Sequence, residues 1–260
     1  PMQMHTKMPE VVLAVCENRV YGVKRLKRMY NDLQVIVLDD AFQHRRIRCG
    51  MNILLTAADN LYVNDHLFPS GKLRDLRSSA LRANMIVVSK CRETMQPMDR
   101  RVIETSLHMA SYQQLFFSYL SYGEEYRLVE PEQDTDDSKK HLHPLVLTAI
   151  ENPEPMLEYL KKRYADMSVL SFADHYKFKK SDLQQIRQTF ESQGCDSIIT
   201  TEKDAARMLS TDIYTNDLRR KTWVLPVEVD FKDHAERFMN PILRYVSENV
   251  RKMGGLNLQN

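Results

Sequence analysis

Short apolar runs alternate with amphipathic stretches along most of this chain, a pattern that predicts strands alternating with helices. Short runs bounded by turn residues are typical of buried parallel strands, and apolar residues at helical spacing between them indicate helices. The apolar runs lie at residues 11–15, 33–38, 51–56, 85–89, 115–120, 144–149, 168–172, 197–201 and 223–229. The helical stretches lie at 19–30, 76–82, 97–109, 152–162, 180–193 and 238–253. We therefore predict an α/β fold class built from βαβ units.

A polar, acidic stretch at residues 124–143 interrupts this alternation and reads as a surface loop or hairpin. We therefore predict two lobes. Residues 1–123 form the first lobe, residues 124–145 form the connection, and residues 146–260 form a second, smaller α/β lobe.

Composition narrows the class of protein only a little. The 260 residues are 43% hydrophobic and 28% charged, with a formal net charge of +2. Such a balance is ordinary for a globular protein and does not argue for a nucleic-acid partner. No apolar run is long enough for a membrane span, and the four cysteines form no CxxC pair. A reducing compartment is the simplest interpretation of the cysteines.

Two adjacent acids, Asp39 and Asp40, end the apolar run Val35–Leu38. Open α/β sheets bind ligands at the carboxyl ends of their strands, and an acid there holds Mg²⁺ in phosphoryl-transfer enzymes. Gln43 and His44 follow within reach of the same crevice, where His44 can contact a metal or a phosphate. The alternatives are an acidic turn capped by Asp40 and a surface histidine, and the local pattern does not decide between them.

Three further segments carry candidate chemistry. In residues 69–75, Lys72 and Arg74 can donate hydrogen bonds to a phosphate, and Asp75 can reach a metal. The alternative is a solvated basic loop. In Asp174-His175-Tyr176, the histidine suits a base, although neighbouring side chains on an extended backbone point apart. In residues 200–205, Thr201 and Asp204 have the spacing of a helix cap.

Together these segments resemble the tetraacyldisaccharide 4′-kinase family, the lipid A kinases of Gram-negative bacteria. The resemblance covers most of the chain, and its ordered set of motifs is specific. The matching segments are Glu17-Asn18-Arg19, Asp39-Asp40-Ala41-Phe42-Gln43-His44-Arg45-Arg46, Pro69-Ser70-Gly71-Lys72-Leu73-Arg74-Asp75, Asn152-Pro153, Asp174-His175-Tyr176 and Thr200-Thr201-Glu202-Lys203-Asp204-Ala205. The family usually has Gly where Ala41 stands and Glu where Asp75 stands.

The resemblance implies a P-loop-kinase-like parallel sheet flanked by helices, and an ATP- and Mg²⁺-dependent reaction. Such enzymes phosphorylate the 4′-hydroxyl of a tetraacylated glucosamine disaccharide 1-phosphate, the lipid A disaccharide precursor. An N-terminal helix holds them on the cytoplasmic face of the inner membrane. The implied roles are catalytic for Asp39, Asp40 and His175, metal-binding for Asp39, Asp40 and Asp75, and cofactor-binding for Gln43, His44, Lys72 and Arg74.

No G-x-x-x-x-G-K-[ST] phosphate loop occurs in these 260 residues. The family carries that loop upstream of the matching region, followed by a Gly-Asp-Glu-Pro segment whose last residue corresponds to Pro1. We therefore expect the chain to be an N-terminally truncated, soluble form with little or no activity. Two alternatives are a non-catalytic remnant that binds nucleotide or lipid, and an unrelated P-loop-like sugar or nucleotide kinase.

Overall fold

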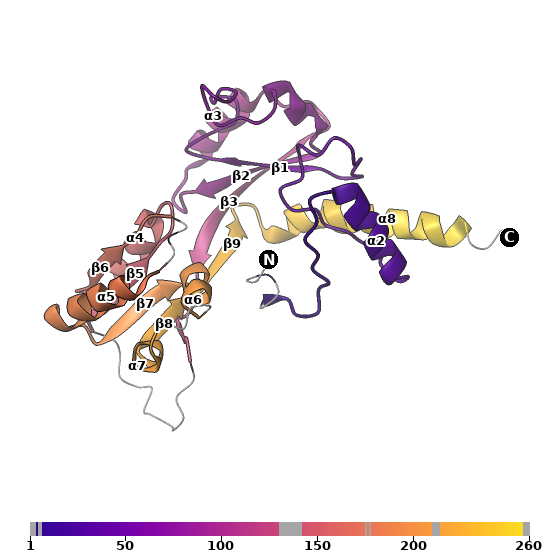
Figure 1. Cartoon of the computed structure of the whole chain (residues 1–260). Coiled ribbons are helices and arrows are strands. Elements are labelled where there is room, and N and C mark those ends of the chain that lie inside the picture. Colours follow the sequence, from indigo (N-terminus) through magenta and orange to yellow (C-terminus); the bar gives the residue numbers. More distant parts are fainter. Residues whose placement is uncertain are drawn as a thin grey trace. The chain divides into compact units, whose positions relative to one another are not determined.

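The structure is a computed structural model, and it describes Met4 and residues 7–129, 142–174, 176, 178–209 and 214–256. It divides into two compact units, and Figure 1 traces the elements of each. Unit 1 comprises Pro1–Leu13 and Ser121–Glu228, and unit 2 comprises Ala14–Leu120 and Val229–Asn260. The C-terminal helix therefore groups with the unit that contains Asp39 and Asp40, whereas the linear division at residues 124–145 assigned it to the second lobe.

Unit 2 contains a four-stranded sheet in the order β1-β2-β3-β9. Its strands are β1 (Ile53–Ala57), β2 (Met85–Cys91), β3 (Gln114–Tyr122) and β9 (Val227–Phe231). Strands β1, β2 and β3 are parallel, and Val87 of β2 lies level with Leu55 and Phe116. The apolar run of β2 is buried on both faces of the sheet, whereas Leu55 of the edge strand β1 is exposed.

Helices cover both faces of this sheet. On one face, Ile86, Val88 and Phe117 pack with Leu107 of α3 (Pro97–Leu107). On the other face, Val87 and Phe116 pack with residues of α8 (Ala235–Leu256), including Phe238. Figure 1 shows α3 and α8 on opposite sides of the strands. Unit 2 also contains α2 (Arg19–Met29) and the 3-10 helix η1 (Arg77–Arg82).

Unit 1 is a second α/β unit, with a five-stranded sheet in the order β4-β8-β7-β5-β6. The strands are β4 (Tyr126–Arg127), β5 (Pro144–Thr148), β6 (Ser168–Ser171), β7 (Ser197–Thr201) and β8 (Thr222–Leu225). All neighbouring pairs are parallel except β4 with β8. The helices are α4 (Glu154–Arg163), α5 (Lys180–Ser192), α6 (Glu202–Leu209) and α7 (Asn216–Arg220).

Alternate residues of β5 face two separate cores. Leu145 and Leu147 pack with Ile186 and Phe190 of α5, whereas Val146 packs with α4. Such burial on both faces is what continuous apolar strands need. The α/β fold class, with parallel strands flanked by helices, is therefore confirmed. Within the described residues, no helix is both long and apolar enough to cross a lipid bilayer.

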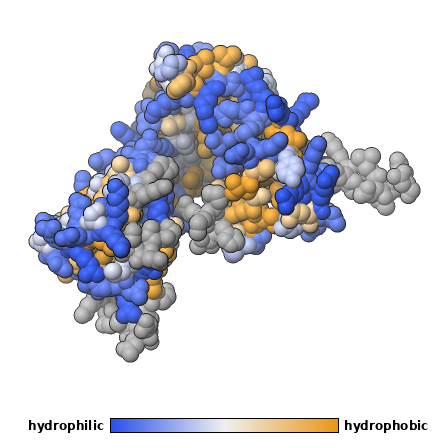
Figure 2. Space-filling view, viewed as in Figure 1, coloured by the Kyte–Doolittle hydropathy of each residue, from blue (hydrophilic) through white to orange (hydrophobic). Residues whose placement is uncertain are grey.

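Two predicted strands, 11–15 and 33–38, are wrong. Neither stretch pairs with a strand in the described part of the chain, and Val37 is 87% exposed. A β-strand needs a hydrogen-bonded neighbour, and β1, at the edge of its sheet, pairs with β2 alone among the strands that the structure describes. Figure 2 shows hydrophobic patches on a mostly hydrophilic visible face, and the exposed large apolar residues include Val15, Val37 and Leu55.

The predicted last strand, 223–229, is also two strands rather than one. Strands β8 and β9 belong to different sheets and are separated by Pro226. Proline has no amide hydrogen for a sheet ladder, so a break at this residue is the physical outcome.

Leu147 tests the core of unit 1, because its side chain is fully buried between β5 and α5. Leu147→Ala is expected to lower the free energy of unfolding by about 2–5 kcal/mol, since it leaves a cavity. Trp223, the single tryptophan, lies in the same unit and reports its unfolding by fluorescence. Leu142→Ala, the same change at an exposed leucine, should stay within about 0.5 kcal/mol of the parent. Equal losses from both variants would contradict this packing.

Candidate functional site

Three residues predicted from the sequence, Asp40, Arg74 and Asp75, form pairs of arginine and carboxylate in unit 2. Arg74 Nη2 lies 2.8 Å from Asp40 Oδ1, and its Nη1 lies 3.5 Å from Asp40 Oδ2. A planar guanidinium that faces both oxygens of a carboxylate fixes orientation as well as distance. Two candidates from separate sequence motifs therefore lie side by side, and both side chains are exposed to solvent.

The backbone at Asp40 turns through the left-handed region, with φ of 45°. Aspartate tolerates this region better than most residues because its short side chain can bond locally. Ala41 is not among the residues with positive φ, and its carbonyl accepts a hydrogen bond from the His44 amide at 2.9 Å.

Asp75 is the centre of a second ionic cluster. Its Oδ1 accepts from Arg45 at 2.9 Å and from the Leu76 amide at 2.9 Å, and its Oδ2 accepts from Arg82 at 3.0 Å. Burial raises the pKa of Asp75, but hydrogen bonds from Ser79, the Leu76 amide and Arg45 outweigh this and hold the pKa below its ordinary value. Both carboxylate oxygens are thus engaged by cationic or amide donors.

Hydrogen bonds to the Asp65 carboxylate hold the loop that carries Lys72. The Asp65 carboxylate accepts from the amide of His66 at 2.7 Å and from that of Lys72 at 3.2 Å. These backbone hydrogen bonds, His66 first, lower the pKa of Asp65. A Cβ at Gly71 would lie 2.3 Å from Asp65 Oδ1 and 2.3 Å from the His66 carbonyl oxygen. Only glycine fits there, and the turn leaves the Lys72 side chain exposed.

A groove of about 570 Å³ joins a third motif to this region. Its walls are the start of α2 with the preceding turn and the segment that follows the two acids. The lining residues are Glu17, Asn18, Arg19, Val20, Gln43, His44, Arg45, Arg46 and Ile47. The Asn18 side chain caps α2 by accepting from the Tyr21 amide at 3.1 Å. The groove therefore has predicted residues, Gln43 and His44, on one wall and a helix N-terminus on the other.

The carboxylates of the three predicted metal ligands differ in how many arginine side chains already bind them. Asp39 is exposed, and in the described part of the chain its carboxylate has no ion pair or hydrogen bond. Asp40 shares its carboxylate with Arg74, and Asp75 is occupied by two arginines. Among the described residues, no three His, Cys, Asp or Glu side chains gather closely enough to hold a metal ion. Asp39 and Asp40 are accessible oxygen donors that suit Mg²⁺, whereas Asp75 suits it less well in this arrangement.

The remaining motifs lie in unit 1. Thr201 caps α6 as predicted, because its Oγ1 accepts from the Asp204 amide at 3.1 Å and donates to Asp204 Oδ2 at 2.9 Å. Asp204, fully buried, also accepts from the Ala149 amide at 3.0 Å and from Arg207 at 3.0 Å. His175 lies outside the described residues.

Several residues in these contacts carried no predicted role. Arg45 was visible in the motif but unassigned, and Arg82 lies outside every motif. Arg82 bonds Asp75, donates to the Phe42 carbonyl at 2.9 Å and stacks over the Phe42 ring at 4.5 Å. Arg82 lies 40 residues from Phe42 in sequence, so no local pattern could have indicated its contacts.

An α/β protein that gathers adjacent acids, arginine forks and an exposed lysine has the groups typical of phosphoryl-transferring enzymes. The sequence pattern of the tetraacyldisaccharide-1-P 4′-kinase family matches residues 1–245. The chain belongs to this family of kinases.

Individual relatives agree with this assignment. The chain is 36% identical over 264 residues to a tetraacyldisaccharide 4′-kinase of Bacteroides thetaiotaomicron, covering 96% of this chain and 70% of that one. It is also 36% identical over 250 residues to the Flavobacterium johnsoniae enzyme, with the same coverage. Its fold is similar to the crystal structure of LpxK from Aquifex aeolicus in complex with ATP, with a TM-score of 0.53 and 18% identity. That match covers 87% of this chain and 62% of the other.

The Asp75 cluster makes stability depend on pH. Because the folded pKa of Asp75 is lowered, its stabilisation is complete above the unfolded pKa of about 3.9 and is lost as the pH falls through the folded value. In Asp75→Asn, the free energy of unfolding of unit 2 should therefore fall less steeply as the pH is lowered below about 4, as measured by circular dichroism. Asp59→Asn, at an exposed aspartate, should leave this pH dependence unchanged. If the free energy of unfolding of Asp75→Asn depends on pH as steeply as that of the parent, Asp75 is not the source of this pH dependence.

Proposed function

We propose that this protein transfers the γ-phosphoryl group of ATP to the 4′-hydroxyl of a tetraacylated glucosamine disaccharide 1-phosphate, the step in lipid A biosynthesis that its family performs. The observation that carries the proposal is the meeting of three family motifs in unit 2. The segments 17–19 and 39–46 line one groove, and arginine–carboxylate contacts join 39–46 to 69–75.

The reaction breaks the bond between the γ-phosphorus and the β–γ bridging oxygen of ATP and joins that phosphorus to the 4′-oxygen. ADP leaves, and the hydroxyl proton passes to a base. Such a transfer needs positioning and charge neutralisation more than covalent chemistry. Asp39 and Asp40 would hold the Mg²⁺ that neutralises phosphate charge when it is bound. Their exposure and oxygen chemistry support this role.

Basic and polar side chains would orient the phosphates. Arg74 already faces Asp40, so its guanidinium lies beside the proposed metal carboxylate and can contact a phosphate oxygen there. Lys72 supplies a mobile positive charge from the adjacent loop, while Gln43 and His44 line the groove. Asp75 remains a predicted metal ligand. Its ion pairs with Arg45 and Arg82 support a different role, in which Asp75 orients these two arginines.

His175 would support the base that accepts the hydroxyl proton. This role follows from its motif, in which it stands between Asp174 and Tyr176. Because the substrate carries four acyl chains, the reaction would take place at a lipid surface, which for this family is the cytoplasmic face of the inner membrane. Sedimentation of the protein with vesicles that contain the tetraacylated substrate tests this location.

The direct test is a phosphoryl-transfer assay with radiolabelled ATP and the tetraacylated disaccharide 1-phosphate. Asp39→Asn and Asp40→Asn should each lower kcat by on the order of 100-fold, because each removes charge that the metal needs. Raised Mg²⁺ should restore part of the loss. Asp59→Asn is the matched control and should keep the parent rate.

Two outcomes of this assay would contradict the proposal. Parent rates in both acid variants would refute the assigned roles. Binding of ATP or lipid without any transfer by the parent protein would favour the non-catalytic binding protein instead.

A further inference from the structure

We propose that residues 65–76 of unit 2 form a membrane-contact loop, whose tip residues Leu67 and Phe68 enter the headgroup region of an anionic lipid bilayer. The inference rests on the proposed function for its reason to meet lipid, because the proposed acceptor is a tetraacylated lipid. It goes beyond that function by naming the surface that makes the contact. All contacts involved lie within unit 2.

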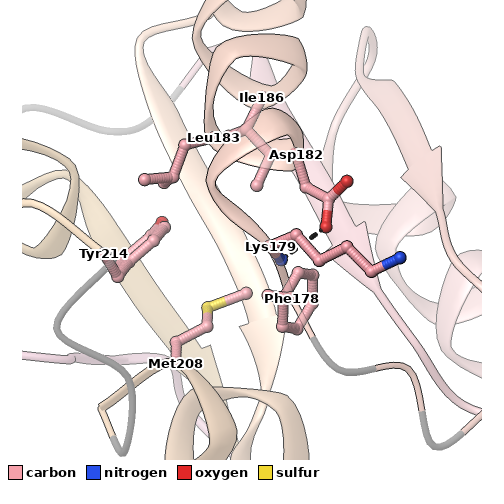
Figure 3. Close-up of a pocket in the computed structure, with 7 residues that line it drawn as sticks. All are labelled: Phe178, Lys179, Asp182, Leu183, Ile186, Met208 and Tyr214. Carbon is pink, nitrogen blue, oxygen red and sulfur yellow. Dashed lines mark hydrogen bonds between the residues drawn. The ribbon is translucent and has the colours of Figure 1, made fainter.

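Neither the cavity in unit 1 nor the groove in unit 2 suits an acyl chain. The cavity, lined by side chains such as Leu183 and Ile186 (Figure 3), has a volume of about 10 Å³, which is room for at most one water molecule. The groove of about 570 Å³ is larger, but charged side chains such as Glu17, Arg19 and Arg46 line it. These two hollows would leave the acyl chains in the bilayer, so the protein would meet its acceptor at the bilayer surface.

The membrane-contact loop presents apolar side chains to solvent. Leu67 is 44% exposed and Phe68 is 79% exposed. Leu76, the residue that precedes η1, is also exposed. Large apolar side chains are unfavourable in water, and exposed ones among polar residues are typical of surfaces that meet a membrane or another protein.

The backbone of this loop suits a water-poor environment, because several of its amides are hydrogen-bonded within the loop. The Phe68 amide donates to the Leu73 carbonyl at 2.9 Å, and the Leu73 amide donates to the His66 carbonyl at 3.0 Å. The Gly71 amide donates to the Leu67 carbonyl at 3.2 Å. An unpaired amide would oppose insertion into lipid, and these contacts remove that cost for the amides concerned.

The base of the loop is fixed to η1. Arg77, the first residue of η1, donates from Nε and Nη2 to the Asp65 carbonyl at 3.0 Å and 2.6 Å. The Asp65 carboxylate in turn accepts from the amides of His66 and Lys72. The loop is therefore closed before it meets a partner, so contact at its tip costs little ordering of the chain.

The charge around the tip is complementary to anionic lipid. Residues 66–82 contain four Lys and Arg side chains and a single acid, Asp75. Lys72 and Arg77 are exposed. Long basic side chains can hold their charge at lipid phosphates while their stems lie on apolar surface, and anionic lipids attract them. An anionic bilayer therefore fits this loop better than an uncharged apolar partner does.

The test is co-sedimentation of the protein with vesicles of phosphatidylglycerol and phosphatidylcholine that contain no acceptor lipid. Phe68→Ser should lower the affinity for these vesicles about 10-fold, because a large apolar side chain no longer enters the bilayer. Added salt should weaken binding of the parent protein, and vesicles of phosphatidylcholine alone should bind it less. Met98→Ser is the matched control, since Met98 is 68% exposed on α3 of the same unit, and it should keep the parent affinity.

A second measurement places the loop at the bilayer directly. In Phe68→Trp, brominated phosphatidylglycerol in the vesicles should quench the added fluorescence. In Met98→Trp, the added fluorescence should stay unquenched. Trp223 is present in both variants and contributes the same background.

Three outcomes would overturn the proposal. The first is failure of the parent protein to bind the anionic vesicles. The second is equal vesicle affinity of Phe68→Ser and Met98→Ser, or equal quenching of Phe68→Trp and Met98→Trp. The third is that Phe68→Ser converts a dimer to a monomer in sedimentation velocity with vesicle binding unchanged, which would mean that the loop covers a second copy of this chain.

None of these measurements uses turnover. If the parent protein transfers no phosphoryl group to detergent-solubilised acceptor, the proposed function fails, while the vesicle measurements still decide whether this loop contacts lipid.

Discussion

Pairing between arginine and carboxylate is the interaction on which the arrangement of unit 2 depends. The segments that carry Asp40 and Asp75 lie 34 and 30 residues from the arginines that bind them, Arg74 and Arg45. Neither segment belongs to a sheet, so backbone ladders do not fix their positions. Single exposed ion pairs stabilise little, but bidentate geometry and several charges in one network raise the contribution. Arg82 adds a third link through Asp75 and Phe42.

The same contacts place limits on chemistry. A carboxylate that is held by arginines is oriented, but its oxygens are less available to a metal. Among the described residues, Asp39 has no ion pair, while Asp40 is shared with Arg74. A phosphate that reached Arg74 would compete with Asp40 for the guanidinium and would leave the carboxylate free to bind a cation. Substrate charge and metal charge would in this way support each other's binding.

Much of the fold could be predicted because most strands are buried on both faces. The apolar runs at β5 and β7 indicate that burial by their composition, and helices such as α5 indicate theirs by the spacing of Ile186 and Phe190. The run at 33–38 is similarly apolar but has no neighbouring strand in the described residues, and composition does not show whether a strand finds a pairing partner. Pro226, by contrast, was a readable signal for the break between β8 and β9.

The contacts among the candidate site residues could not be predicted from the sequence. The motifs identified Asp40, Arg74 and Asp75, yet the pairing of Asp75 with Arg45 and Arg82 depends on distant parts of the chain. The hydrogen bond from Lys203 to Asp174 also joins residues far apart in sequence, with a separation of 29 residues. A helix cap such as Thr201 with Asp204 can be predicted from the local sequence, because both residues lie within one helical turn.

A double-mutant cycle on Arg45 and Asp75 tests most directly whether these pairs join the motifs. Unfolding of unit 2 would be followed by circular dichroism for the parent, Arg45→Ala, Asp75→Asn and the double variant, with Trp223 fluorescence reporting unit 1 separately. We predict a coupling energy of about 0.5 kcal/mol or more, because the two side chains share one network. Strictly additive losses would show that the two segments are held together by something other than this pair.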